Sequence, residues 1–240
     1  MLLAALESRR PTKDVDLAGL DLANDIETVL GLVRQTLEVE PVPVDGIEFA
    51  TETAIAEVIR EGDDYSGVRV QVQARLASAK LPFHVDVNVG DPIWPDPTPV
   101  AVPRLLGGTP ITLSGYPIPM VHAEKIVTAI QRGIANTRWR DFGDIWSLSR
   151  RHRVSGEVLQ RATTEVATYR GTILRPLTEV LDGFAPMAQT RWSRWRRRTN
   201  LDNVPEQFER VLREVIAFAD PALTGAADEL MWDPEASTWT

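Results

Sequence analysis

The sequence predicts an α+β fold in which an α/β core is followed by a helical part. In the first half of the chain, apolar and polar residues alternate in short runs, which is typical of half-buried strands. In the second half, apolar residues recur at helical spacing. The 240 residues are 43% hydrophobic and 25% charged, which suits one large or two small globular domains with a hydrophobic core.

The first half is expected to supply the strands of the core. The clearest run is 67–77, where valines alternate with polar residues, and it is expected to pair with the next strand through a turn at 78–80. A helix is expected at 22–37, because its apolar residues recur at helical spacing. Pro41 is expected to end it. Further elements are expected as strands at 14–17, 47–49, 82–89 and 111–113, a turn or short helix at 53–60, and a proline-rich loop at 92–103.

Helices are expected to dominate the second half. The apolar positions predict helices at 123–133, 141–150, 155–169, 175–184 and 205–219. The last segment is polar and acidic and is expected to be loosely attached. We therefore expect three parts, a core at 1–120, a helical domain at 121–220 and an acidic tail at 221–240.

Composition excludes several classes of protein. The chain has no cysteine, so disulfides and thiolate metal sites are excluded, and a reducing cytoplasm is compatible. No apolar run approaches the roughly 20 residues that a membrane span needs. The start of the chain is too short and lacks the basic leader of a signal peptide. We therefore expect a cytoplasmic protein without a membrane partner.

Two aspartates one residue apart are the most informative feature of the sequence. Asp14 and Asp16 lie on a predicted strand, where side chains two residues apart share a face. Two like charges held this close are unfavourable unless a proton or cation lies between them. Hard divalent cations such as Mg²⁺ or Mn²⁺ prefer carboxylate oxygens and often bind substrate phosphates as well. The pair suggests phosphoryl or nucleotidyl transfer, and a solvated turn is the alternative.

A third carboxylate belongs to another predicted strand. In residues 82–89, Phe83, Val85, Val87 and Val89 are expected on one face, and His84, Asp86 and Asn88 on the other. An unpaired buried charge is costly, so Asp86 either faces solvent on a half-exposed sheet or belongs to a site. Beside Asp14 and Asp16, it would complete a cradle for two cations.

A second chemical cluster is expected at 121–148. Lys125 is expected near a helix N-terminus, where the helix dipole disfavours a cation, so phosphate binding is one role and a surface lysine the other. Asp141 and Asp144 are about one helical turn apart and share a face. They would cap the helix, pair with Arg138 and Arg140, or orient a reacting group.

Charge is unevenly distributed. The net charge of −8 argues against a general affinity for nucleic acid. One tract nevertheless gathers five arginines and two tryptophans, namely Arg191, Trp192, Arg194, Trp195, Arg196, Arg197 and Arg198. It would follow an RNA phosphate backbone and stack on exposed bases. The alternative is a solvated helix end whose tryptophans pack inward.

Three segments together resemble the AbiEii-type nucleotidyltransferase toxins, which include the mycobacterial MenT toxins. They are Arg-Arg-Pro-Thr-Lys-Asp-Val-Asp-Leu at 9–17, Glu-Lys at 124–125, and Asn-Thr-Arg-Trp-Arg-Asp-Phe-Gly-Asp at 136–144. The resemblance covers residues 1–150 well and the helical remainder more loosely. It implies a DNA polymerase β-like nucleotidyltransferase core with a mixed sheet.

The resemblance also implies a reaction and its residues. Such proteins transfer a nucleoside monophosphate from an NTP to an acceptor, which in MenT-like members is the 3′ end of tRNA, and this blocks translation. Asp14 and Asp16 would bind Mg²⁺ and activate the acceptor hydroxyl, with Asp86 as the third carboxylate. Thr12, Lys125 and Arg138 would bind the nucleotide, and Asp141 or Asp144 would supply the late acidic motif. A cognate antitoxin is the expected protein partner.

The chain departs from the family pattern at its start. The family places a Gly-Gly or Gly-Ser turn shortly before the Arg-x-Thr-x-Asp-x-Asp motif, where backbone N–H groups cradle the triphosphate. Residues 1–9 contain no such turn. The chain is therefore either a shortened version or a degenerate member of the family. Two alternative functions stay open, a nucleotidyltransferase that modifies a protein or small molecule, and an N-terminally shortened, inactive binding protein. The catalytic hypothesis requires that Lys125 converge with Asp14 and Asp16 in one cleft.

Overall fold

The computed structural model describes residues 14–41, 44–59, 67–104, 107–199 and 203–240. Within these, the chain forms two compact units, 14–91 and 92–240. The division after Asp91 differs from the predicted core boundary at 120. The reason is that the described strands between 92 and 120 pair with each other and not with the sheet of the first unit.

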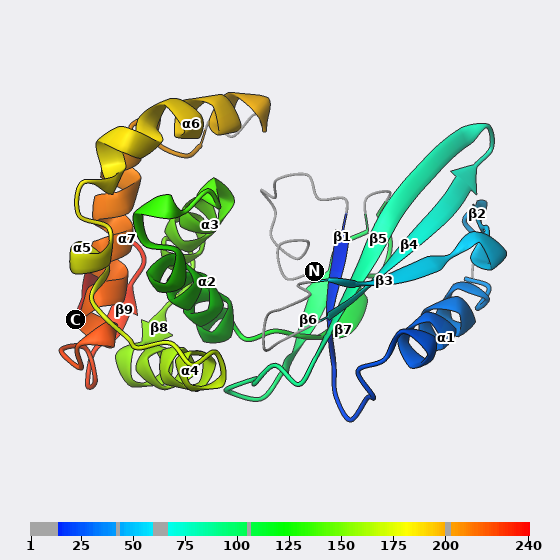
Figure 1. Ribbon diagram of the computed structural model, residues 1–240, viewed down its shortest axis with the longest axis horizontal. Coiled ribbons are helices and arrows are strands. Elements are labelled where there is room, and N and C mark those ends of the chain that lie inside the picture. The colour runs from blue at the N-terminus through cyan, green and yellow to red at the C-terminus, as the bar shows by residue number, and fades with distance from the viewer. Residues whose placement is uncertain (1–13, 42–43, 60–66, 105–106, 200–202) are drawn as a thin grey trace. The chain divides into compact units, whose positions relative to one another are not determined.

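A mixed five-stranded sheet forms the first unit (Figure 1). β1 runs parallel to β5, whereas β4 is antiparallel to β5, β2 and β3. The order is β1-β5-β4-β2, and β3 also pairs with β4. The strands are β1 (Asp14–Gly19), β2 (Ile47–Phe49), β3 (Ile55–Ile59), β4 (Gly67–Leu76) and β5 (Ala79–Val89).

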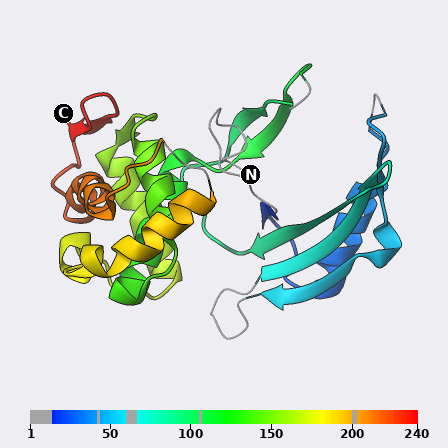
Figure 2. The ribbon, with the colours of Figure 1, turned by 90° about the horizontal axis from the view of Figure 1, so that it is seen from above.

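Helix α1 (Ile26–Leu37) covers one face of this sheet (Figure 2). The carboxylate of Asp25 accepts a hydrogen bond of 2.8 Å from the Thr28 backbone N–H, which caps the helix. Two buried residues of the helix, Val29 and Val33, pack against the inward-facing valines Val68, Val70, Val72, Val85 and Val87. Because side chains alternate along a strand, the polar residues of β4 and β5 lie on the opposite face, as the sequence predicted.

The second unit begins with a two-stranded sheet and continues mainly as helices (Figure 1). The two strands are β6 (Thr98–Val102) and β7 (Ile111–Gly115). The helices are α2 (Ile118–Arg132), α3 (Trp139–Ser149), α4 (Gly156–Tyr169), α5 (Leu177–Val180), α6 (Phe184–Arg198) and α7 (Phe208–Leu223). A three-stranded sheet combines β8 (Val154–Ser155), β9 (Met231–Asp233) and β10 (Thr238–Trp239).

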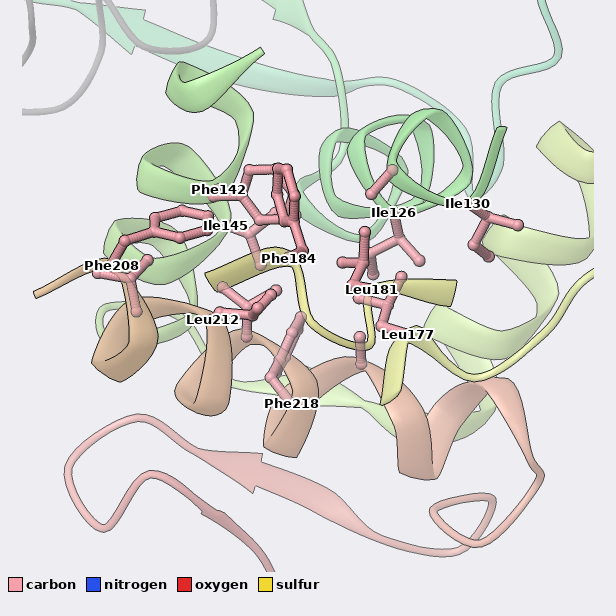
Figure 3. Packing of buried hydrophobic residues seen from close by; sticks show 14 of the residues in the cluster. Ile126, Ile130, Phe142, Ile145, Leu177, Leu181, Phe184, Phe208, Leu212 and Phe218 are labelled. Carbon is pink, nitrogen blue, oxygen red and sulfur yellow. The ribbon is translucent and has the colours of Figure 1, made fainter. Parts of the chain in front are cut away.

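An aromatic cluster fills the core of the second unit (Figure 3). Phe142 of α3, Phe184 of α6 and Phe208 of α7 meet with ring centroids 5.4 to 5.8 Å apart. Such pairs add to the stabilisation that burial of each ring provides. The core therefore ties three helices together. No helix in the described part of the chain is long and apolar enough to cross a membrane.

Two predictions for the stretch 53–103 are wrong. The turn or short helix expected at 53–60 is instead a short 3-10 helix (Thr51–Thr53) followed by strand β3. The loop expected at 92–103 contains strand β6, which includes Pro99. Within the described residues β6 pairs with β7 alone, so one edge of β6 has no neighbouring strand. Pro99, which has no backbone N–H, is tolerated in such an edge strand.

Two helical predictions and the prediction for the tail also need correction. Helix α2 begins at Ile118 and not at 123, because Pro119 lies in its first turn, where no intrahelical hydrogen bond is lost. The helix expected at 175–184 is only the four-residue α5, and Gly183 with φ of 71° starts α6. The tail is not loosely attached, since Trp232 is buried and its indole N–H donates to the Ser149 carbonyl at 2.6 Å.

Candidate functional site

The parallel pairing of β1 and β5 brings the predicted carboxylates together. In this register Asp14 lies beside His84 and Asp16 lies beside Asp86. Residues two apart on a strand share a face, so all three aspartates lie on the polar face of the sheet. We call Asp14, Asp16 and Asp86 the acidic cluster. The structure confirms that Asp14 and Asp16 share a face, and it places Asp86, for which the sequence left two alternatives open, beside them.

The acidic cluster fits a divalent cation. One carboxylate oxygen from each of the three residues lies within 4.8 Å of the others. Asp86 is buried, Asp14 is half-buried and Asp16 is exposed, so the cluster is open on one side. Hard cations such as Mg²⁺ and Mn²⁺ take oxygen ligands of this type. Close carboxylates repel one another until a cation neutralises them, so the donor set suits such an ion.

Arg69 is a member of this site that the sequence analysis did not single out. It lies on β4 directly opposite Asp86. Its Nε and Nη2 donate to the two Asp86 oxygens at 2.7 and 2.6 Å, a bidentate pair. The hydrogen bond with Asp86 raises the pKa of Arg69, although partial burial opposes it. Asp14 and Glu57 contribute further attraction.

A signal for Arg69 was present in the sequence. The turn between β4 and β5 lies at 77–78 and not at the predicted 78–80, so Leu76 pairs with Ala79, and the antiparallel register then fixes all the remaining pairs. Counting back seven residues from Leu76 and forward seven from Ala79 gives Arg69 and Asp86. An arginine on the polar face, opposite a buried aspartate, is the expected partner of that charge.

A second charged cluster joins two helices of the second unit. The Lys125 ammonium of α2 donates to Asp141 at 3.2 Å and to Asp144 at 3.0 Å, both on α3. Asp141 and Asp144 are buried, being 2% and 6% exposed. Arg138 also donates to Asp141. We call Lys125, Asp141 and Asp144 the lysine cluster. The structure confirms that Asp141 and Asp144 share a face.

Each charged group of the lysine cluster stabilises the charged form of its partner. Burial alone would lower the pKa of Lys125, but Asp144 and Asp141 outweigh it and the net shift is upward. Burial alone would raise the pKa of Asp141, but Lys125 and Arg138 outweigh it and the net shift is downward. Lys125 therefore stays protonated and Asp141 stays ionised at neutral pH. Both groups are held in position as charges.

Three local interpretations of this cluster are wrong. Lys125 lies in the middle of α2, not at its start, so the helix dipole is not the reason for its placement. It is also not a surface lysine, because its side chain is 16% exposed. Arg138, not Asp141, is the N-cap residue of α3, and Asp141 lies in the first turn. The buried carboxylates account for the lysine instead.

The arginine–tryptophan tract forms the end of α6. Trp192 and Trp195 are buried, and the Trp192 indole N–H donates to the Pro205 carbonyl at 3.0 Å. Their predicted stacking on RNA bases is therefore wrong, because the rings fill the core. Arg196 is half-buried and donates to the Val204 carbonyl at 2.7 Å. The exposed members are Arg191, Arg194, Arg197 and Arg198.

Two further predictions are not tested. Thr12, predicted to bind the nucleotide, lies outside the described residues. The convergence of Lys125 with Asp14 and Asp16 concerns two separate units and stays a prediction.

Comparison with known proteins gives one family and one solved structure. A family model described as "Nucleotidyl transferase AbiEii toxin, Type IV TA system" matches residues 1–225. No curated protein gives a significant match. A crystal structure described as a "putative nucleotidyltransferase from H. pylori" is similar, with 14% sequence identity and a TM-score of 0.49. That match covers 90% of this chain and 81% of the other.

Proposed function

The chain belongs to the AbiEii family of nucleotidyl transferase toxins of type IV toxin–antitoxin systems, and we propose that it transfers a nucleoside monophosphate from an NTP to the 3′ end of tRNA. The acceptor hydroxyl oxygen attacks the α-phosphorus, the bond to the β-phosphate oxygen breaks, and pyrophosphate leaves. The hydroxyl proton is lost to water. A nucleotide added at this end would block aminoacylation and halt translation.

The acidic cluster is the observation that carries this proposal. Asp14 and Asp16 on β1 lie beside Asp86 on the parallel neighbour β5, in a mixed sheet backed by a helix. This arrangement supports a core of the DNA polymerase β type. A bound Mg²⁺ would supply stabilisation of the attacking and leaving oxygens in an in-line displacement. Carboxylates of the cluster would hold that ion and so would orient the acceptor hydroxyl.

The lysine cluster supports a role in nucleotide binding. Lys125 has three N–H donors, and two of them point to Asp141 and Asp144. Among the described residues, no third acceptor is found for this ammonium. The remaining donor is therefore available to a phosphate oxygen of the NTP, and Asp141 and Asp144 fix its direction. Arg138, which is anchored on Asp141, and Thr12 are further candidates for nucleotide contacts.

The exposed arginines of α6 support an RNA acceptor. Arg191, Arg194 and Arg198 recur at spacings of three and four residues, which places them on one side of the helix. None of the three has an ion-pair partner among the described residues. Because the tryptophans are buried, these arginines would bind phosphates and not stack with tryptophan on bases. The α6 surface would then position the tRNA backbone.

Family membership also implies a protein partner. A type IV toxin–antitoxin system contains an antitoxin, so we propose that this toxin acts in the cytoplasm under the control of a cognate antitoxin. Both the tRNA and the NTP that the reaction requires are found there.

The test is a transfer assay with the purified chain. Each radiolabelled NTP would be incubated with Mg²⁺ or Mn²⁺ and either total tRNA, other RNA or a protein lysate. Asp16→Asn removes one carboxylate of the acidic cluster. Glu52→Gln is the matched control, since Glu52 is an exposed carboxylate of the same unit that lies outside the cluster.

We expect metal-dependent label on tRNA for the unaltered chain and for Glu52→Gln, and none for Asp16→Asn. Label on protein or on a small molecule would replace tRNA as the acceptor. No label on any acceptor with any NTP would overturn the proposed activity.

A further inference from the structure

Both oxygens of the Asp86 carboxylate are engaged by Arg69. The two hydrogen bonds measure 2.7 and 2.6 Å, and the Asp86 side chain is only 8% exposed. Arg69 is itself fixed, because the register of β4 and β5 places the two residues directly opposite each other. Asp86 is therefore a member of the acidic cluster whose charge is already neutralised. Its two neighbours, Asp14 and Asp16, are the more accessible carboxylates.

The charges of the site also separate Asp86 from Asp14 and Asp16. Three carboxylates carry three negative charges, and Arg69 carries one positive charge. Among these four side chains the remainder is two negative charges, the charge that one divalent cation balances. Arg69 also interacts electrostatically with Asp14 as well as Asp86. A second cation beside Asp86 would have to approach a fixed guanidinium and displace a bidentate hydrogen-bonded pair, which is unfavourable.

We propose that Arg69 competes with the divalent cation for Asp86, so that the acidic cluster binds one cation through Asp14 and Asp16 while Asp86 stays paired with the arginine. This inference rests on the proposed function, because it assumes that the cluster binds a cation. It assigns Arg69 as a positioning residue that sets the number and affinity of bound cations. Asp86 becomes a cation ligand only when Arg69 is removed.

The same arrangement explains why a buried aspartate is tolerated beside two others. Arg69 compensates the charge of Asp86 without a cation, and the β4–β5 pairing then carries no uncompensated buried charge. Asp14 and Asp16 lie on β1, which pairs with β5 and not with β4, so neither is directly opposite Arg69. The cluster thus divides into a structural carboxylate and two that would bind the ion.

The test measures binding of Mn²⁺ alone, by calorimetry and by electron paramagnetic resonance, without NTP or RNA. The unaltered chain is expected to bind one Mn²⁺. Asp16→Asn is expected to weaken binding by roughly a hundredfold, and Asp86→Asn by only about tenfold, because Asp86 is not a ligand but its loss leaves the charge of Arg69 uncompensated beside the ion. Arg69→Met removes the charge and releases Asp86, so Mn²⁺ affinity is expected to rise roughly tenfold. The double variant Arg69→Met/Asp86→Asn is expected to lose that gain.

Arg69→Lys keeps a positive charge and provides a second variant if Arg69→Met fails to fold. Its Mn²⁺ affinity is expected to stay within about threefold of the unaltered chain. Circular dichroism would confirm that each variant is folded. An Asp86→Asn variant that loses Mn²⁺ as completely as Asp16→Asn would overturn the inference, and so would a loss of affinity in Arg69→Met.

Failure of the inference is distinguishable from failure of the proposed function. If the unaltered chain binds no Mn²⁺, the metal-dependent function fails and the inference fails with it. If the unaltered chain binds Mn²⁺ and Asp16→Asn does not, the function stands, and the Arg69 and Asp86 variants alone decide the inference.

Discussion

Asp16 and Asp86 lie directly opposite each other on the parallel strands β1 and β5. Asp14 lies on the same face, so three carboxylates share a small area of the sheet. Like charges placed opposite each other destabilise a sheet. Arg69 neutralises Asp86 but leaves Asp14 and Asp16 close together. The site therefore lowers the stability of the metal-free protein, which is a common cost where residues serve binding and not folding.

The repulsion between these carboxylates predicts that Asp16→Asn raises the stability of the metal-free protein but lowers the stability gained from Mn²⁺. Asp16→Asn is expected to stabilise the metal-free protein by about 0.5 kcal/mol, because it removes a like charge from the cluster. Mn²⁺ at about 100 times its Kd is expected to stabilise the unaltered chain by about 2.7 kcal/mol and the variant far less. Thermal unfolding with EDTA and with Mn²⁺ measures both effects. Glu52→Gln is the control and should change neither. An Asp16→Asn variant that is less stable than the unaltered chain in EDTA would contradict this account.

Removal of the Lys125 charge is expected to destabilise the second unit. Lys125→Met would leave Asp141 and Asp144 buried without their shared cation, at a cost of about 3–5 kcal/mol. Arg138 would still pair with Asp141 and would compensate part of the loss. Urea denaturation followed by tryptophan fluorescence measures the change. An effect below about 1 kcal/mol, the range of exposed ion pairs, would show that the cluster is not buried in solution.

A triple variant separates stability from nucleotide binding. Lys125→Met/Asp141→Asn/Asp144→Asn removes the lysine and both carboxylate charges together, so most of the lost stability is expected to return. If Lys125 binds phosphate, the refolded triple variant still shows a raised KM for the NTP. Recovery of both stability and KM would assign the cluster a structural role alone.

The sheet and its polar face were predictable from local patterns. Alternation of valines with polar residues on β4 and β5 settles which side chains face α1, and the chain needs only a tight turn to fix the register. The same period of two places Asp14 with Asp16 on one face. The parallel contact of β1 with β5 joins distant parts of the chain, so no local pattern predicts that Asp16 lies beside Asp86 in particular.

The helical part was less predictable because its interactions are between helices. Asp141 was interpreted as a cap from its position in the sequence, whereas a lysine on α2 decides its environment. For α6 a local signal did exist. Phe184, Ala188, Trp192 and Trp195 recur at spacings of four, four and three, the pattern of a buried helix face. That spacing favours the inward-packing interpretation over base stacking.

A buried histidine predicts a pH dependence of stability. His122 is fully buried, and burial, followed by the charges of His152 and Lys125, lowers its pKa from 6.5 to about 3. The unfolded chain therefore binds a proton that the folded chain does not between these values. Stability is complete above about pH 6.5 and is lost as the pH falls toward 3, by at most about 1.4 kcal/mol per pH unit.

His122→Leu is expected to flatten this dependence. Urea denaturation at pH 7.5, 6.0 and 5.0 gives the free energy of unfolding of both proteins and its slope with pH. The difference between the two proteins at pH 7.5 reports the packing change alone. The pKa of Asp141 is lowered, so its contribution is lost only below the range tested. Burial also lowers the pKa of His152, and His152→Gln is the control for that second histidine. Parallel curves for the unaltered chain and His122→Leu would show that His122 does not carry the effect.

The exposed arginines of α6 predict a salt-dependent RNA affinity. Each phosphate contact releases counterions, so the logarithm of the affinity for single-stranded RNA falls with the logarithm of salt by about 0.7 per contact. The triple variant Arg191→Gln/Arg194→Gln/Arg198→Gln is expected to reduce that slope by about 2 and to weaken binding of different sequences alike. Fluorescence anisotropy with labelled 3′-end RNA at several salt concentrations measures both quantities. Arg132→Gln/Arg153→Gln/Arg213→Gln removes three other exposed arginines and the same net charge. If the control lowers the slope equally, affinity follows net charge and the α6 surface is not the binding site.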